Sequence, residues 1–422
     1  MVKKGQGIFN WGRGIFKNTT SPIGIQEDFK IKQGGDKKRY WILIIASVVN
    51  FVHGNPYIWT VFQPYVKKEF HLSDAASSQP FTIIIGIFAL GNMLGGWLQQ
   101  KIGAKWTILA GSALMCAGFG LAGIAPYDMP WLISMGYGAL GGLGSGCAFS
   151  MLTAVPLQWF PEKRGLVSGI TVGVVGVSGI IMNPFCDFLL AGHGYRFAML
   201  TITAIYGVLC LGGFFVEDRP DDMRSEGEDP VSVGTGIASC VKQYRTGEIL
   251  RTRTYYTISL TMALAVPAYV LVNPLMKSLG MERGLTGAEA LLGVTLASVA
   301  NIIGRFAMPW LSDRVGRKAV IRGMYLAAAV AVVGLVAARG GIFILLISVV
   351  CLVYGGVVSV FPVVVSDHFG LKYQGINYGA VMIGYGIASI LCPYLLDGLG
   401  LEASFVAAGV ACVIGLVGTR FF

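Results

Sequence analysis

The chain has 422 residues, of which 54% are hydrophobic and 13% are charged, whereas soluble globular domains carry about 25% charged residues. A soluble core of this length could not bury so much apolar surface. The formal net charge of +10 does not indicate nucleic acid as a partner, because the basic residues lie in short connecting segments. We therefore expect an all-α membrane protein whose main solvent is lipid.

The apolar residues fall in runs of about twenty, the length at which a helix crosses the hydrocarbon layer. Taken in chain order, these runs lie at residues 40–65, 79–99, 105–125, 130–156, 164–189, 196–216, 254–277, 287–311, 319–338, 341–366, 376–397 and 401–419. They predict twelve transmembrane helices in two pseudo-symmetric six-helix halves. The predicted domains are a basic cytoplasmic tail (1–39), an N-terminal half (40–216), a cytoplasmic linker (217–253) and a C-terminal half (254–422).

The distribution of Lys and Arg predicts the orientation of these helices, since basic residues are retained on the cytoplasmic side. If both termini are cytoplasmic, 25 of the 32 basic residues lie inside, 6 lie outside and Arg305 lies within a helix. We therefore predict a multi-pass protein of the cell (inner) membrane with both termini in the cytoplasm.

An internal repeat supports two related halves. Residues 96–105 (GWLQQKIGAK) follow the second span, and residues 309–318 (PWLSDRVGRK) follow the eighth span at an offset of 213. Four positions of the ten match, and the cationic positions align. Related halves of this kind place a solute site near the bilayer midplane, where the halves meet.

The repeated segments resemble the loop signature of the major facilitator superfamily, and the resemblance implies that fold. The second copy is nearly complete, while the first has Gln100 where an aspartate is expected, so hydrogen bonds could replace charge there. The resemblance implies a conformational latch made by Asp313, Arg314, Arg317 and Lys101. Lys163 and Arg164, by contrast, are expected to anchor their loop at lipid headgroups.

Further motifs resemble the monocarboxylate transporter and oxalate/formate antiporter group within that superfamily. They occur in the same order over residues 40–419, and it is this order that makes the resemblance specific. The motifs are GNPYIWTVF at 54–62, WFPEKRGL at 159–166, YGG at 354–356, FP at 361–362, DHFG at 367–370 and NYG at 377–379.

Arg305 is the one strongly ionised residue deep inside an apolar span. An unpaired charge at that depth costs several kcal/mol, and a guanidinium matches a carboxylate bidentately, so an anionic substrate could supply the counter-charge. Asn301 and Ser298 share its helical face. The alternative is that Arg305 reaches the cytoplasm or caps carbonyls of a neighbouring helix. The resemblance implies that this arginine occupies the family's substrate-binding position.

Two departures from the family pattern bear on the substrate. Asn301 stands where animal-type monocarboxylate transporters have an aspartate, and Tyr385 stands where the antiporter pattern has a second cation. One cation in a dry pocket suits one carboxylate better than two. Tyr385 could donate a hydrogen bond to the substrate or could simply pack.

His53 is the single histidine deep in an apolar run, and its ordinary pKa makes it a proton-coupling candidate. It could equally be a satisfied hydrogen-bond partner between helices. The remaining predicted substrate-binding residues, each of which could instead be a packing residue, are Tyr57, Tyr354, Ser359 and Asn273.

These observations predict a secondary active transporter of small monocarboxylates such as lactate, pyruvate or formate, coupled to H+ by alternating access. Organic anion exchange is the alternative, and a non-transporting membrane sensor is a more distant one. The sequence shows no catalytic constellation, nucleotide loop or metal motif, so we expect no enzyme activity, cofactor or metal. We expect a monomer whose partners are a small organic anion, H+ and membrane lipids.

Overall fold

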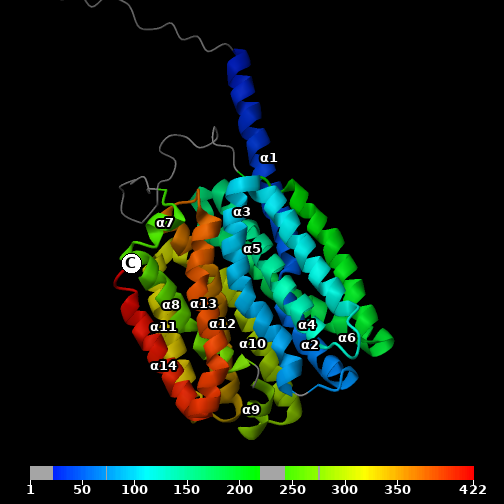
Figure 1. The fold of residues 1–422 in the computed structure, drawn as a ribbon. Coiled ribbons are helices and arrows are strands. Elements are labelled where there is room, and N and C mark those ends of the chain that lie inside the picture. Colours follow the sequence, from blue (N-terminus) through cyan, green and yellow to red (C-terminus); the bar gives the residue numbers. More distant parts are fainter. Residues whose placement is uncertain (1–21, 73, 219–242, 274–275) are drawn as a thin grey trace, which may run out of the picture. The chain divides into compact units, whose positions relative to one another are not determined.

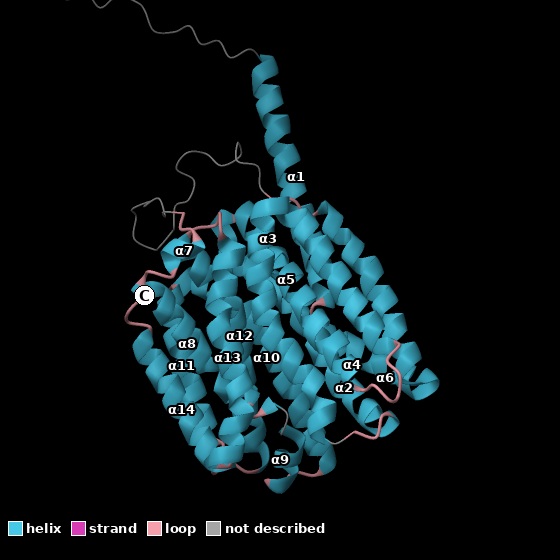
Figure 2. Cartoon of the chain, in the orientation of Figure 1, coloured by secondary structure: helices cyan, strands magenta, loops and turns pink. Residues whose placement is uncertain are grey.

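The computed structural model describes residues 22–72, 74–218, 243–273 and 276–422, and these residues form helices joined by loops and contain no strand (Figure 2). In lipid every backbone polar group needs a partner within the protein, and an α-helix supplies those partners within each segment. Residues 1–21 of the predicted tail and 219–242 of the predicted linker lie outside the described residues.

The helices follow one another along the chain with short connections (Figure 1). The first series comprises α1 (Pro22–Val52), α2 (Asn55–Glu69), α3 (Asp74–Gly123), α4 (Trp131–Ile133), the π-helical segment η1 (Ser134–Leu140), α5 (Gly141–Trp159), η2 (Pro161–Lys163), α6 (Arg164–Cys210) and η3 (Leu211–Phe215). The second series comprises α7 (Thr246–Ile249), α8 (Arg253–Val270), α9 (Met276–Glu282), α10 (Gly287–Val315), α11 (Arg317–Gly334), α12 (Gly340–Phe369), α13 (Gln374–Leu399) and α14 (Leu401–Gly418).

Eight helical stretches of the described chain are long and apolar enough to cross a membrane. Two of them, in α3 and α6, each contain two crossings, because the backbone turns at Gly103 and Gly194 with φ of 79° and 78°. Glycine is suited to such left-handed positions since it has no Cβ. These stretches account for ten crossings, and the 18-residue helices α8 and α11 lie at the positions of the two remaining predicted spans, 254–277 and 319–338.

The first crossing is not the single helix that the apolar run at 40–65 predicts. Its helix is interrupted at His53 and Gly54, which form a turn between α1 and α2. Pro56 lacks the N–H that a continuous helix would use and its ring disfavours the preceding turn. Gly54 lies against α6, where an added Cβ would meet the Ser178 hydroxyl at 1.6 Å. Helix α1 also begins well before residue 40, at Pro22.

Residues 1–41 and residues 42–422 form two separate units. Within the second unit lie two clusters of buried hydrophobic residues. One cluster is drawn almost wholly from residues 42–216, and the other almost wholly from residues 249–422. Ala89, Phe149, Val172 and Val175 cross from the first series into the second cluster, so the two helix series contact each other through α3, α5 and α6.

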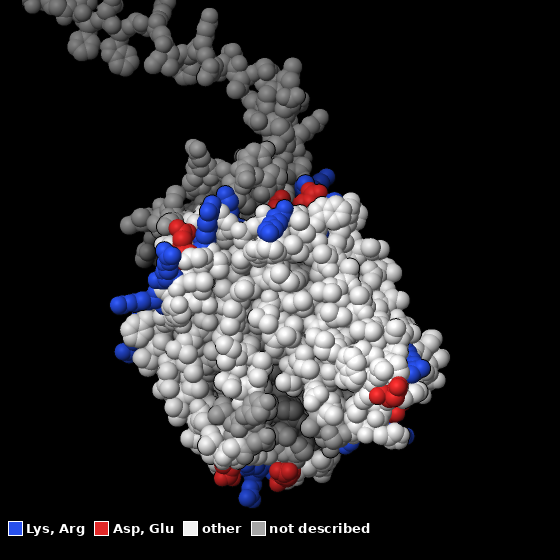
Figure 3. Space-filling view, viewed as in Figure 1, with Lys and Arg blue, Asp and Glu red and all other residues white. Residues whose placement is uncertain are grey.

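Charged side chains on the visible face lie towards two opposite ends, and a broad uncharged band separates them (Figure 3). Such a band is what a hydrocarbon layer requires. One of these ends holds α7 and residue 218, the last described residue of the first helix series (Figure 1). We call it the linker end.

Helices α10 and α12 are in backbone contact at two glycines. A Cβ at Gly304 would lie 1.9 Å from the Leu352 carbonyl oxygen, and one at Gly355 would lie 2.0 Å from the Asn301 carbonyl oxygen. In a membrane, small residues let helices approach closely and gain dispersion contacts. This contact fixes the position of Arg305, the residue after Gly304.

Gly304→Ala is therefore expected to destabilise the protein by about 2 kcal/mol, because the new methyl group must push two helix backbones apart. Thermal unfolding in detergent measures the effect. Gly323→Ala in α11 is the matched control, since an added Cβ there meets nothing within 4 Å and alanine favours the helix. A Gly304→Ala variant that melts with the control would contradict the packing argument.

Candidate functional site

Arg305 lies in α10 at the contact between the two helix series, and its side chain is 2% exposed. Its guanidinium donates three hydrogen bonds. Nε donates to Asn301 Oδ1 at 3.0 Å, one terminal nitrogen donates to the Val172 carbonyl oxygen at 3.1 Å, and the other donates to the Tyr57 hydroxyl at 2.5 Å. Val172 belongs to α6 and Tyr57 to α2, so the guanidinium joins the C-terminal half to the N-terminal half.

All three acceptors are neutral. Among the described residues no carboxylate forms an ion pair with Arg305, although ion pairs do occur at the linker end. The side chain is buried within the helices, so the alternative that it reaches the cytoplasm is wrong. It does cap one carbonyl of a neighbouring helix, at Val172, but the other two bonds go to side chains.

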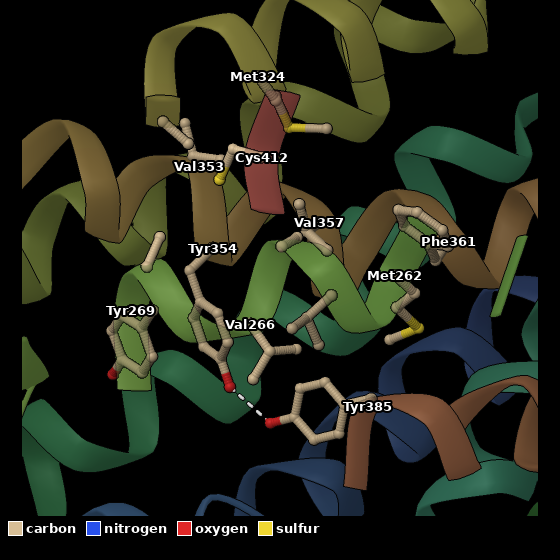
Figure 4. Close-up of a cluster of buried hydrophobic side chains, with 14 of the residues drawn as sticks. Met262, Val266, Tyr269, Met324, Val353, Tyr354, Val357, Phe361, Tyr385 and Cys412 are labelled. Carbon is tan, nitrogen blue, oxygen red and sulfur yellow. Dashed lines mark hydrogen bonds between the residues drawn. The ribbon is translucent and has the colours of Figure 1, made fainter. Parts of the chain in front are cut away.

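Three tyrosines complete the surroundings of the guanidinium. The Tyr354 and Tyr385 hydroxyls share a hydrogen bond of 2.6 Å, and the Tyr269 ring stacks on the Tyr354 ring at 3.7 Å between centroids and 7° between planes (Figure 4). All three tyrosines, like Tyr57, lie near the Arg305 guanidinium. The site thus offers one permanent cation among several neutral hydroxyl groups.

Tyr269 is a site residue that the sequence did not identify. It lies one helical turn before Asn273, which was predicted, and a helical repeat applied to that prediction would have indicated it. Asn273 itself lies half-buried just beyond the end of α8, and no hydrogen bond joins it to the other predicted residues among those described.

Two predicted serines do not join the guanidinium. Ser298 is exposed and its hydroxyl donates to the Val294 carbonyl of its own helix; it shares a face with Arg305 but lies roughly 10 Å further along the axis. The Ser359 hydroxyl donates to the Gly355 carbonyl within α12. Both hydroxyls are therefore occupied by their own helices.

His53 lies in the turn between α1 and α2 and is 2% exposed. Neither of its ring nitrogens has a hydrogen-bond partner among the described residues, so the alternative of a satisfied partner between helices is wrong. The neighbouring Asn50 amide, in contrast, donates to the Thr171 carbonyl of α6 at 2.7 Å. A buried imidazole without a protein partner is costly, so this turn would favour a hydrogen-bonding group beside the His53 ring.

Comparison with known proteins identifies the family. A model of the Major Facilitator Superfamily matches residues 42–393, most of the chain. The chain belongs to the major facilitator superfamily. Its fold agrees, because a solved proton:xylose symporter of that superfamily superimposes with a TM-score of 0.72 over 92% of this chain and 96% of the symporter, at 14% identity. The protein is thus a multi-pass membrane transporter and not an enzyme.

The chain is also similar to members of the two groups within the superfamily that the motifs indicated. The oxalate:formate antiporter of Oxalobacter formigenes is 27% identical over 91% of this chain and 91% of its own length. Monocarboxylate transporter 13 of Bos taurus is 29% identical over 56% of this chain and 52% of its own length. The resemblance to these two groups is therefore confirmed.

An ion network joins the halves of this superfamily member at the linker end. The Asp313 carboxylate accepts hydrogen bonds from the Gly165 and Leu166 backbone N–H groups at 3.1 and 3.0 Å. Asp313 also pairs with Arg317 at 2.5 Å. Asp367 in turn pairs with both Arg164 and Arg317, each at 3.0 Å.

The network corrects part of the latch prediction. Asp313 and Arg317 belong to it, but Arg314 lies over the Trp310 ring and Lys101 over the Trp97 ring. The expectation that Arg164 anchors at lipid headgroups is wrong, because this side chain is 5% exposed and paired with Asp367 in the other half. Arg164 and Asp367 are 203 residues apart, which is why sequence spacing could not pair them.

The N-terminal half uses hydrogen bonds at the corresponding place. Asp218 accepts from the Gln99 amide at 2.6 Å and from the Ala104 backbone N–H at 2.9 Å. Gln100, which stands where the second repeat has Asp313, donates only to the Gly96 carbonyl of its own helix at 3.4 Å. A carboxylate from beyond the sixth crossing thus holds this loop within its own half, whereas Asp313 joins the two halves.

Proposed function

We propose that this protein is a secondary active transporter of small monocarboxylates such as lactate, pyruvate or formate, and that it moves them with H+ by alternating access. The observation that carries the proposal is the buried guanidinium of Arg305, whose three acceptors are all neutral. A carboxylate is the group that would neutralise it while accepting two of its hydrogen bonds.

The position of Arg305 supports alternating access as well as binding. Its partners Val172 and Tyr57 belong to the opposite half, so a carboxylate that replaced them would change the contacts between the halves. A ligand shifts a conformational equilibrium only through such differences in contact. The single cation favours one carboxylate over two, and the Tyr354–Tyr385 pair can donate to a further substrate oxygen without adding charge.

Uptake of labelled lactate, pyruvate and formate into proteoliposomes tests the proposal. We expect the parent protein to transport at least one of them and Arg305→Ala to transport none above the protein-free background. Equal uptake by the two proteins would contradict the assignment of Arg305. A thermal-shift panel of mono- and dicarboxylates identifies the acid, because a ligand that binds only the folded state raises the apparent stability.

Organic anion exchange is a second candidate, and it is favoured by the similarity to an oxalate:formate antiporter along nine-tenths of both chains. Exchange requires an internal anion and does not require a pH gradient. Counterflow that depends on internal formate or oxalate and ignores a pH gradient would support exchange over symport with H+.

We further propose that His53 carries the coupled proton, since Asn301 cannot do so and neither ring nitrogen of His53 has a hydrogen-bond partner in the described part of the chain. His53→Gln is expected to lower pH-gradient-driven uptake by about tenfold and to leave counterflow nearly unchanged, because glutamine fills the site but cannot take up a proton. His193→Gln, outside this turn, serves as the control. Unchanged stimulation by the gradient in His53→Gln would exclude His53 from coupling.

We also propose that the linker end faces the cytoplasm of the cell and that the protein works as a monomer. The asymmetry of Lys and Arg in the sequence supports this orientation. Labelling of single cysteines in intact cells tests it: a cysteine at Lys318 should be protected from an impermeant reagent, and one at Asp128 should react.

A further inference from the structure

Lys101 and Arg314, which do not take part in the latch, occupy equivalent positions in the two halves. Lys101 Nζ lies 3.9 Å from the Trp97 ring centroid, and the Arg314 guanidinium lies 4.0 Å from the Trp310 ring centroid. Each pair is four residues apart, and the pairs are offset by the same 213 residues as the repeat. Trp97 is 45% exposed and Trp310 is 41% exposed. The repeat therefore preserves an exposed aromatic–cation pair beside each latch loop.

The pair in the N-terminal half belongs to a larger group. Lys105 Nζ lies 3.3 Å from the Phe214 ring centroid and 5.6 Å from the Trp106 ring centroid. Both rings are about half exposed. We call these residues, contributed by α3 and η3, the α3 rim cluster: Trp97, Lys101, Lys105, Trp106 and Phe214.

The two ammonium groups of the α3 rim cluster have no acidic partner within ion-pair distance among the described residues. The Asp218 carboxylate lies beside the turn between the two lysines, where it accepts hydrogen bonds from Gln99 and Ala104. The cluster lies at the linker end, where Lys and Arg side chains border the uncharged band (Figure 3). Two positive charges thus stand at the boundary between water and lipid beside three exposed aromatic rings.

We propose that the α3 rim cluster binds the headgroup of an anionic phospholipid. The phosphate would lie between the ammonium groups of Lys101 and Lys105. The part of the acyl chains next to the glycerol would lie along the exposed tryptophan rings, because tryptophan favours the level of the headgroups. A zwitterionic lipid carries its own cation and would leave the two lysines uncompensated. The ligand is therefore a lipid with net negative charge, recognised separately from the transported solute.

Native mass spectrometry of the purified full-length protein tests the proposal with phosphatidylglycerol and phosphatidylcholine as probes. The parent is expected to retain phosphatidylglycerol in preference to phosphatidylcholine. The double variant Lys101→Gln/Lys105→Gln is expected to bind phosphatidylglycerol about thirtyfold more weakly, since each lysine near an anionic lipid contributes about fivefold in affinity. Lys68→Gln, an exposed lysine at the opposite end, should match the parent.

Equal retention of the two lipids by the parent, or equal retention of phosphatidylglycerol by the parent and the double variant, would overturn the proposal. Glycerol phosphate, which lacks acyl chains, is expected not to displace the lipid. Displacement by glycerol phosphate at the same concentration would show that the aromatic surface takes no part. The double variant should have the same melting temperature as the parent, which confirms that these exposed substitutions leave the fold intact.

Discussion

Replacing Arg305 with lysine is expected to weaken substrate affinity about a hundredfold, although the positive charge is kept. The guanidinium donates from three nitrogens at once, to Asn301, Val172 and Tyr57. An ammonium on a shorter stem cannot present the same planar fork to a carboxylate. Loss of one or two charge-assisted hydrogen bonds, at about 1.5–3 kcal/mol each, corresponds to a ten- to hundredfold or greater change in affinity.

The measurement is the concentration dependence of initial uptake for whichever monocarboxylate the parent transports. Arg339→Lys is the control, because Arg339 is exposed in the connection before α12 and touches neither the site nor the latch. An Arg305→Lys variant whose half-saturating concentration lies within about threefold of the parent value would show that charge alone suffices. That result would remove the argument for bidentate recognition.

The helical architecture could be predicted from the sequence because a lipid environment restricts which backbone structures can span it. Apolar runs of about twenty residues have to form helices, and the glycines at 103 and 194 mark turns that separate paired crossings. The break at His53 and Gly54 was less accessible. An apolar run gives no sign of the interruption, which depends on the close approach of Ser178 in α6 as well as on Pro56.

The centre of the site, Arg305, could also be predicted, because lipid depth makes a charged residue unusual. A lone arginine at membrane depth is rare enough to single out, and Asn301, one turn away, follows from helical geometry. Tyr57 contacts the guanidinium from 248 positions away in the chain, and only the motif resemblance indicated it. Ser298 shows the limit of helical-face reasoning, because a shared face says nothing about depth along the helix.

The latch likewise has residues that the sequence predicted and residues that only the structure reveals. Asp313 and Arg317 are close in sequence and were predicted together, whereas Asp367 and Arg164 come from different halves and meet only in the folded chain. Lys101 and Arg314 were assigned to the latch by motif alone. Their side chains lie instead over the rings of tryptophans one helical turn earlier in the chain.

Asp367→Asn is expected to shift the conformational equilibrium towards forms that are open at the linker end. Asp367 pairs with Arg164 of the N-terminal half and Arg317 of the C-terminal half, and these three side chains are 14%, 5% and 20% exposed. Removing one partner of a fully buried ion pair costs about 3–5 kcal/mol. Partial exposure reduces this to roughly 2–3 kcal/mol, or about a 30- to 150-fold change in the ratio of closed to open forms.

Spin labels at Lys163 and Lys318, both exposed at the linker end, report this shift as a longer distance in pulsed electron paramagnetic resonance. The backbone N–H groups of Gly165 and Leu166 still bind Asp313 in the variant, so the closed form should persist as a minority and not vanish. Asp128→Asn, in an exposed connection between α3 and α4, is the control and should leave the distances unchanged. If Asp367→Asn also leaves them unchanged, the contacts of Asp313 alone hold the linker end closed, and the pairing of Arg164 with Asp367 has no part in alternating access.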